Sequence, residues 1–425
     1  GNVAFFVSRP KDACIMSIGC KKDDFLGGIS EAVGEEERAR QHGFTESELE
    51  RAKKLYLNAA ERKLKMEKDY RNGHYVSQCV DHFLEGEPIL TPAYNLQLVK
   101  QFDGEVTLAE DNQSVGNIIT DKNQVFVMYG PDKEGFVIPS ESEIEATVLA
   151  AQKKQYEPYQ EEKIPSTLMS ALPKPGKIVS EKPYGKLGMT EITLSNGMKV
   201  YVKPTDYQAD QVMMSMRAEG GTSLYGNGDI PNFSLLTSAI TEAGVGDFSA
   251  TALRKALAGK SIRLAPSISS EGQRLAGSSS VKDMETMLQL AHLYFMAPRK
   301  DSVAFEGLKN RTLSFLKNRN ASSKVVYNDS LSAVLYDHNL RMAPVTGEVL
   351  AKADYGRIIE IYRERFSDAS NFKTVFIGKI DMAELRPLLC QYLATLPSTY
   401  KKEETDKANV PQIVMKNETV KFVHQ

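Results

Sequence analysis

The sequence predicts an α/β (α+β) fold in two domains, with helices packed against sheets. Three observations support this fold class. The chain has 425 residues, whereas one domain takes roughly 150 residues. Helical and strand-like patterns occur on both sides of a proline-rich stretch at 156–182. Between two strand-like runs of the second half stands Asn196-Gly197, the strongest short signal for a β-hairpin.

The first predicted domain covers residues 1–155. Its second long helix begins with a capping box, in which Thr45 accepts from first-turn amides and Glu48 bonds back to the start of the helix. Ser140 and Glu143 form the same pattern at a later helix. The other elements predicted here are strands near 3–7, 12–19 and 123–131, and helices near 23–41, 73–85 and 92–102.

The prolines of 156–182 predict a semi-rigid linker, because this stretch lacks helical periodicity. A second domain follows at 183–398, and 399–425 is predicted to be a linker and the start of a further, truncated domain. In the second domain we expect the Asn-Gly hairpin, a third strand, strands near 261–280 and a last strand in "NFKTVFIGKI", with helices near 231–243, 249–258, 282–296, 301–318 and 381–393.

Composition excludes several classes of protein. Hydrophobic content of 41% with 25% charged residues is typical of a soluble globular protein. A net charge of −2 gives no electrostatic footprint for nucleic acid, so peptide or protein partners are expected instead. The longest apolar runs are strand-sized, so no membrane span is predicted. The chain opens without Met and reaches a strand by residue 3, which suggests a piece of a longer protein.

The stretch "DHFLEGEP" at 81–88 resembles part of an inverted zinc motif, H-x-x-E-H, because His82 and Glu85 are three residues apart. The fifth position is Gly86, which supplies no ligand and favours a helix C-terminus. Pro88 stops the helix two residues later. We therefore interpret this stretch as a helix end with His82 in its last turn, where a cation interacts favourably with the helix dipole.

The remaining metal-ligating and nucleophilic residues form no recognisable site. His74 is eight residues from His82, too far along a helix to share one ion, and Cys79 lies off their face. His292 and His338 are isolated in the sequence. The four cysteines contain no C-x-x-C, and there is no G-x-S-x-G or P-loop pattern.

Three stretches together bring a family to mind: "HGFTESELERAKK" at 42–54, "LSNGMKVYVKP" at 194–204 and "FSDASNFKTVFIGKIDMAELRPLLCQYLATLP" at 366–397. They resemble signatures of the pitrilysin or insulinase family of zinc metallopeptidases, which includes the mitochondrial processing peptidases. The resemblance implies a clamshell architecture of related domains, each a mixed, mostly antiparallel sheet packed against helices.

The same resemblance implies a domain register. Residues 1–155 resemble the later part of a second, non-catalytic domain, and 156–182 the linker between the halves. Residues 183–398 resemble a third domain, an inactive copy of the catalytic fold, and 399–425 lead into a truncated fourth domain. Zinc is expected in an upstream first domain of the parent protein, and no cofactor is expected in this segment.

In this register the zinc motif has a place, "PNFSLLTSA" at 231–239, after the hairpin and its next strand. Asn232 occupies the motif position of the first His, Leu235 that of the Glu and Leu236 that of the second His. Leucine offers neither a lone pair nor a general base, so this slot is predicted to be degenerate. No Asp or Glu lies between Glu306 and Asp329, where the resemblance places the distal ligand.

We therefore expect the interior segment of a zinc metalloendopeptidase, inactive alone, that supplies chamber wall, hinge and peptide-substrate surface. Its partners would be the missing first and fourth domains or a catalytic partner subunit. The alternative is a non-catalytic scaffold or peptide-binding subunit derived from the family, distinguished by the absence of H-x-x-E-H upstream. The resemblance alone favours a periplasmic or cell-envelope location.

Overall fold

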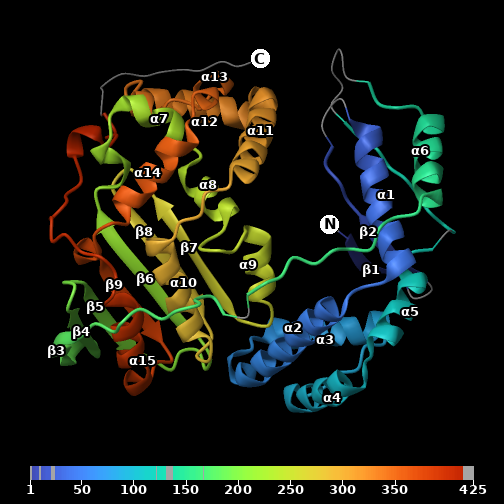
Figure 1. Cartoon of the computed structure of the whole chain (residues 1–425), viewed down its shortest axis with the longest axis horizontal. Coiled ribbons are helices and arrows are strands. Elements are labelled where there is room, and N and C mark those ends of the chain that lie inside the picture. The colour runs from blue at the N-terminus through green and yellow to red at the C-terminus, as the bar shows by residue number, and fades with distance from the viewer. Residues whose placement is uncertain are drawn as a thin grey trace. The chain divides into compact units, whose positions relative to one another are not determined.

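The computed structural model describes residues 2–8, 11–20, 24–120, 122–130, 137–165 and 167–414. The chain divides into two compact units, Gly1–Lys163 and Ile164–Gln425 (Figure 1). The division falls inside the stretch for which a linker was predicted.

Unit 1 is mostly helical. Its described strands form one antiparallel hairpin, β1 (Asn2–Ser8) and β2 (Lys11–Met16). Its helices are α1 (Phe25–His42), α2 (Glu46–Lys65), α3 (Asn72–Glu85), α4 (Pro92–Glu105), α5 (Leu108–Ile118) and α6 (Glu141–Lys153). Both predicted capping boxes are confirmed, at Thr45 and at Ser140. A small apolar core joins α1 to α6 through Ile29, Val33, Val148 and Ala151.

The strand predicted near 123–131 does not form over its described part, 123–130, and residue 131 lies outside the described residues. Residues 124–130 have no regular secondary structure, although their apolar composition favours a strand. Met128 packs against the core of α1 and α6, while Val125, Val127 and Tyr129 are exposed. A strand requires a neighbour for its backbone hydrogen bonds, and the described part of unit 1 places none beside this segment.

Unit 2 is built on a seven-stranded sheet with the order β3-β4-β5-β9-β6-β8-β7. The strands are β3 (Ile178–Tyr184), β4 (Met189–Leu194), β5 (Lys199–Pro204), β6 (Val212–Glu219), β7 (Ile262–Ile268), β8 (Gly272–Ser279) and β9 (Lys373–Gly378). Only β5 and β9 pair in parallel, and every other pair in this sheet is antiparallel. The predicted mixed, mostly antiparallel sheet is confirmed in this unit.

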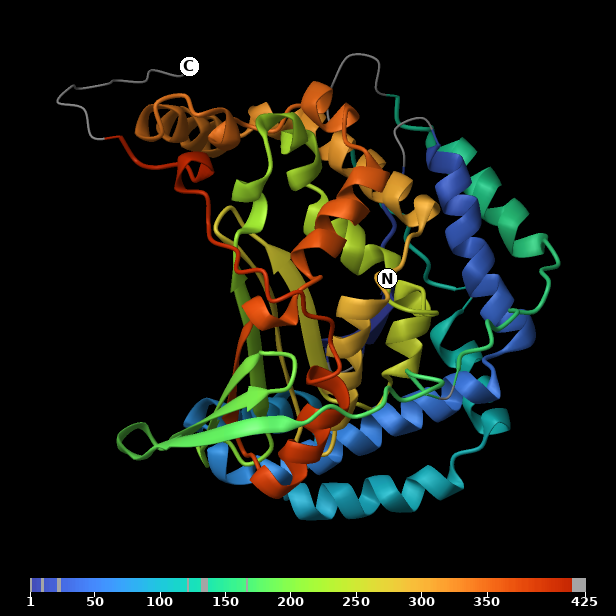
Figure 2. The same ribbon diagram turned by 60° about the vertical axis from the view of Figure 1, so that its left-hand side comes forward.

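Helices cover one face of this sheet. They include α8 (Leu236–Ala243), α10 (Met284–Met296) and α14 (Tyr355–Arg365), which lie against the strands in Figures 1 and 2. The other α-helices described in unit 2 are α7 (Ile230–Phe233), α9 (Ala250–Ala256), α11 (Ser302–Asn318), α12 (Ser323–Leu335), α13 (Gly347–Ala351) and α15 (Met382–Leu388), the last continued by a π-helical turn, and α11 packs on α8. Inward side chains such as Val200, Met216, Leu275 and Phe376 are fully buried against these helices.

The Asn-Gly hairpin between β4 and β5 is confirmed, and both residues have a structural reason. Gly197 adopts φ of 84°, a left-handed conformation that glycine tolerates best. The buried Asn196 amide donates to the carbonyl oxygens of Leu393 (2.8 Å) and Leu396 (3.0 Å). The turn is thereby tied to the end of the chain segment that follows α15.

Each edge strand of the sheet contains a proline. β3 begins inside the stretch predicted as linker and includes Pro183, whereas β7 includes Pro266. The backbone N–H of Ser280 donates to the Ser261 carbonyl, and that of Ser269 donates to the Gly272 carbonyl. Odd-numbered residues of β7 therefore direct their backbone groups toward β8, and the even-numbered Pro266 directs its nitrogen the other way. Its nitrogen therefore faces the free edge, where it supplies no N–H donor to an added strand.

Candidate functional site

The slot predicted to be degenerate lies at the junction of α7 and α8. Asn232 is on α7 and only 5% exposed. Its Nδ2 donates to Asp229 Oδ1 (3.2 Å), and its Oδ1 accepts the backbone N–H of Asp354 (2.8 Å). The amide therefore bridges the loop before α7 to the residue that caps α14.

Leu235 and Leu236 belong to the core of unit 2. They are 2% and 1% exposed, respectively, and pack in the main hydrophobic cluster. A zinc site needs about three protein ligands with free lone pairs. The leucines have none, and the Asn232 oxygen already accepts a backbone N–H. These three residues do not fit a zinc ion.

The helix expected to carry the distal ligand is α11, which packs against α8. An ion pair between Arg311 on α11 and Glu242 on α8 ties the two helices together near the surface. The sequence of α11 after Glu306 contains no carboxylate. α11 therefore contacts α8, but the part of α11 after Glu306 supplies no carboxylate ligand.

Arginine side chains hold the loop before α7. Arg341 donates to the carbonyl oxygens of Thr222 (3.1 Å) and Tyr225 and to Asn227 Oδ1 (3.1 Å). Arg357 on α14 forms two parallel hydrogen bonds with Asp229, Nε to Oδ1 at 3.0 Å and Nη2 to Oδ2 at 3.1 Å. The hydrogen bonds from Arg357 lower the pKa of the Asp229 carboxyl.

Tyr225 lies between two guanidinium groups. The carbons at the centres of the Arg357 and Arg365 guanidiniums are each 5.4 Å from its ring centroid. Its hydroxyl accepts from Arg365 Nε (2.9 Å) and donates to Glu364 Oε2 (2.7 Å). Burial, followed by the bond to Glu364, raises the pKa of this hydroxyl far above its ordinary value. The tyrosine is therefore a neutral structural contact and not a general base.

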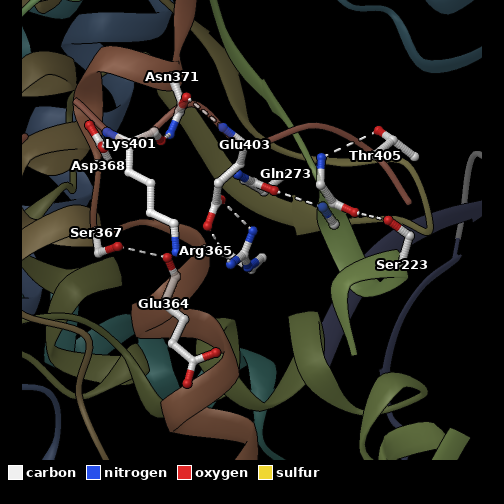
Figure 3. A network of polar contacts seen from close by, with 12 residues as sticks. Ser223, Gln273, Glu364, Arg365, Ser367, Asp368, Asn371, Lys401, Glu403 and Thr405 are labelled. Carbon is white, nitrogen blue, oxygen red and sulfur yellow. Dashed lines mark hydrogen bonds and ion pairs between the residues drawn. The ribbon is translucent and has the colours of Figure 1, made fainter. Parts of the chain in front are cut away.

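The segment 399–411, here called the strap, was predicted to be a linker, but it is fastened to unit 2. The Glu403 carboxylate forms an ion pair with Arg365, with Nη1–Oε2 at 2.6 Å and Nη2–Oε1 at 3.1 Å (Figure 3). The Arg365 side chain is 6% exposed and the Glu403 side chain 25%, so the arginine is buried and the carboxylate is partly open to water. The backbone N–H of Lys401 donates to Asp368 (3.1 Å), and Asn371 donates to the Lys401 carbonyl (2.8 Å).

The far end of the strap contacts the loop that follows β6. Thr405 accepts the N–H of Gly220 (3.4 Å) and donates to the Glu271 carbonyl (2.7 Å). The Ser223 hydroxyl, labelled in Figure 3, accepts the N–H of Asp406 (3.0 Å). The acidic and hydroxyl residues of the strap suggest a solvated linker in the sequence. In the structure they form specific hydrogen bonds with unit 2.

The "DHFLEGEP" stretch is a helix end, as predicted. α3 ends at Glu85, and Gly86 adopts a left-handed conformation with φ of 79° whose N–H donates to the His82 carbonyl. His82 Nδ1 lies 2.7 Å from the Glu87 carbonyl oxygen. The candidates His74, Cys79 and Glu85 are not brought together as ligands, and His74 stacks on Tyr70 instead. The described residues contain no group of three or more His, Cys, Asp or Glu that could hold a metal.

His292 and His338 also lie apart from the slot residues. His292 is buried on α10, where its Nδ1 lies 3.0 Å from the Tyr392 carbonyl oxygen. Burial lowers the pKa of His292, so it is a neutral packed imidazole. His338 is exposed in a turn after α12 with φ of 56°. Both agree with a structural role for these side chains.

The Asp229–Arg357 pair predicts a specific acid dependence. Since the native pKa of Asp229 is lowered, the pair stabilises the fold fully above the unfolded pKa, about 4, and the contribution is lost as pH falls through the native pKa. We expect Asp229→Asn to reduce stability by about 1 kcal/mol at neutral pH, and the difference to shrink below about pH 4. Calorimetric Tm measurements across this pH range test it, with the exposed Glu306→Gln as control. A difference that does not change with pH would contradict the assignment.

No family model matches the chain. A zinc protease PQQL-like protein of Arabidopsis thaliana is 24% identical over 396 residues, covering 92% of this chain and 38% of the relative. The probable zinc protease PqqL of Haemophilus influenzae is 22% identical over 365 residues, covering 84% and 38%, respectively. The chain thus spans about two-fifths of the length of these relatives.

Solved structures show the same fold. The periplasmic protease PqqL from Escherichia coli matches with a TM-score of 0.54 at 18% identity, over 94% of this chain and 44% of that protein. The ferredoxin protease FusC, in a complex with Arabidopsis ferredoxin, matches with a TM-score of 0.52 at 14% identity, over 89% and 42%, respectively. Unit 2 and unit 1 together therefore have the fold that these two proteases share.

The relatives and the structural neighbours agree on the class of protein. The predicted resemblance to the pitrilysin/insulinase family is confirmed, and the chain is a relative of the PqqL-type zinc proteases. None of the helices among the described residues combines the length and apolar character that a bilayer crossing requires.

Proposed function

We propose that this chain is an interior, non-catalytic part of a zinc-dependent peptidase of the pitrilysin/insulinase family. The observation that carries the proposal is the filling of the zinc slot. Asn232 is engaged by Asp229 and Asp354, and Leu235 and Leu236 are core residues. A site that is replaced by packing and hydrogen bonds stabilises a domain instead of catalysing hydrolysis.

The two units would have different roles in the parent enzyme. Unit 1 would brace an upstream catalytic domain that holds the zinc. The part of the predicted linker that precedes β3, 156–177, would act as the hinge between halves, and unit 2 would form a wall of the chamber that receives the substrate. Zinc-protease relatives and a neighbour solved with a bound protein support a polypeptide as the substrate. The periplasmic location of the Escherichia coli neighbour supports a cell-envelope location.

The proposal predicts that the purified chain binds no stoichiometric zinc and cleaves no peptide. After incubation with zinc and dialysis, metal content is measured by inductively coupled plasma mass spectrometry. Turnover is measured with a quenched fluorescent peptide library, with thermolysin as the positive control. Cleavage that a chelator abolishes and added zinc restores would refute the proposal, because this chain would then have to supply its own ligands.

A further inference from the structure

Four cations form a row across the solvent face of the sheet in unit 2. Lys199 on β5 is the register partner of Lys373 on β9, and Lys373 is the partner of Arg217 on β6. Arg217 is in turn the partner of Arg274 on β8. All four side chains are exposed, whereas their neighbours along each strand are buried beneath the helices. These four residues are here called the basic row.

The basic row continues into hydroxyl residues at both ends. Arg274 is the register partner of Ser267 on β7, and Lys199 is the partner of Thr193 on β4, which pairs with Ser180 on β3. One register line therefore crosses the whole sheet without a carboxylate. Such a line offers an anion both charges and hydrogen-bond donors.

This arrangement is unfavourable for the free protein, because like charges directly opposite each other on a sheet destabilise it. The carboxylates nearby neutralise the row only in part. Glu191 lies 3.2 Å from Lys199, and Glu219 is two residues along β6 from Arg217. Among the residues that the structure describes, neither Arg217 nor Lys373 has an ion pair within 4.0 Å. The centre of the row is thus an uncompensated pair of cations.

On β5, β9, β6 and β8 the next register line of the same face is largely apolar. It contains Tyr201, Val375, Ser215 and Ala276, of which Val375 is exposed, and it continues on β4 to Glu191, the ion-pair partner of Lys199. Arg274 Nε donates to Ser215 Oγ (3.0 Å), which holds that guanidinium against the face. The face therefore offers a line of cations beside a shallow apolar strip, and such a combination suits a polypeptide that carries acidic and apolar side chains.

We propose that the basic row binds an acidic, extended segment of the polypeptide substrate, laid across the strands. This inference rests on the proposed function and names the class of substrate that unit 2 favours. Three strand spacings make the row about 14 Å long, which an extended chain of about five residues spans. Carboxylates of that segment would supply the charges that the row lacks. A net charge of −2 for the chain and the apolar strip favour a polypeptide over a nucleic acid.

The test uses the complete chain and three labelled probes: hexaglutamate, hexaglutamine and an oligothymidylate of matching length. Fluorescence anisotropy is measured at about 20 mM and at about 300 mM salt, because exposed charges are screened at the higher value. Hexaglutamate is expected to bind more tightly than the other two, and to weaken at high salt. Equal binding of hexaglutamate and hexaglutamine would overturn the acidic preference, and tighter binding of the oligothymidylate would overturn the assignment to a polypeptide.

A double variant gives a second readout. Arg217→Gln with Lys373→Gln should weaken hexaglutamate binding about tenfold at low salt. The same variant should raise Tm by about 1 °C, because the opposed cations are gone. Arg254→Gln with Lys324→Gln changes the net charge equally on α9 and α12 and should alter binding by less than about twofold. Equal weakening by both double variants would refute a localised site.

Failure of this inference and failure of the proposed function are distinguishable. Stoichiometric zinc or chelator-sensitive cleavage would refute the proposed function, whatever hexaglutamate does. Equal affinity for the acidic and neutral probes would refute the basic row as a binding site, and it would leave the zinc-free character of the chain unaffected.

Discussion

Introducing the residues of the inverted zinc motif, H-x-x-E-H, into the slot is expected to destabilise the fold without creating a zinc site. The triple variant Asn232→His, Leu235→Glu and Leu236→His should lose at least about 4 kcal/mol of stability. It places a carboxyl and an imidazole at positions that are 2% and 1% exposed, within the main core. It also removes the amide that joins Asp229 to Asp354. Zinc would still lack the distal carboxylate.

Urea unfolding and metal analysis of the triple variant measure these two effects together. The matched control is Leu235→Met with Leu236→Met, which keeps the volume and apolar character of the core and should cost less than about 1.5 kcal/mol per site. A triple variant that keeps the wild-type free energy of unfolding and holds one zinc per chain would show that the backbone of the slot can still form a zinc site. That outcome would overturn the structural interpretation of the slot.

Breaking the ion pair between Arg365 on α14 and Glu403 in the strap is expected to have the second large effect. Arg365→Met leaves Glu403 without its partner and removes the donor to the Tyr225 hydroxyl. Removal of one member of a buried ion pair typically costs about 3 kcal/mol. Because Glu403 anchors the middle of the strap, residues 399–411 should lose their protection against hydrogen exchange while the sheet keeps its own.

Hydrogen–deuterium exchange with mass spectrometry resolves the strap from the sheet. Arg363→Met is the control, since Arg363 is an exposed residue of the same helix. The double variant Arg365→Met with Glu403→Met should recover part of the lost stability, because no unpaired charge remains. Unchanged exchange in the strap of Arg365→Met would show that the remaining bonds from Asp368 and Thr405 suffice to hold it.

Local signals predicted local structure well. The capping boxes at Thr45 and Ser140 and the Asn-Gly turn depend on contacts within a few residues, and all three are present. The failure at 124–130 has the opposite cause, because a strand depends on a neighbour that local sequence does not specify. β3 was missed because it lies at the end of a proline-rich stretch and itself contains Pro183, although an edge strand tolerates a proline.

The candidate site was visible in the sequence only in part. The family resemblance placed the slot at Asn232, Leu235 and Leu236, and the two leucines offer no ligand group, so the slot could be identified without a structure. The strap needed tertiary structure, because Glu403 and Arg365 are 38 residues apart. The basic row needed the strand order, since Lys199 and Lys373 become neighbours only through a parallel pairing between β5 and β9.

If unit 2 receives a polypeptide as proposed, the prolines on the two edges of its sheet favour one mode of binding over another. A peptide that adds to an edge is held through its main chain, which is the same in every sequence. Pro183 and Pro266 weaken that mode at both edges. A peptide on the broad face is held through its side chains. Selection by this unit would then depend on what the substrate's side chains are and not merely on whether its backbone is extended.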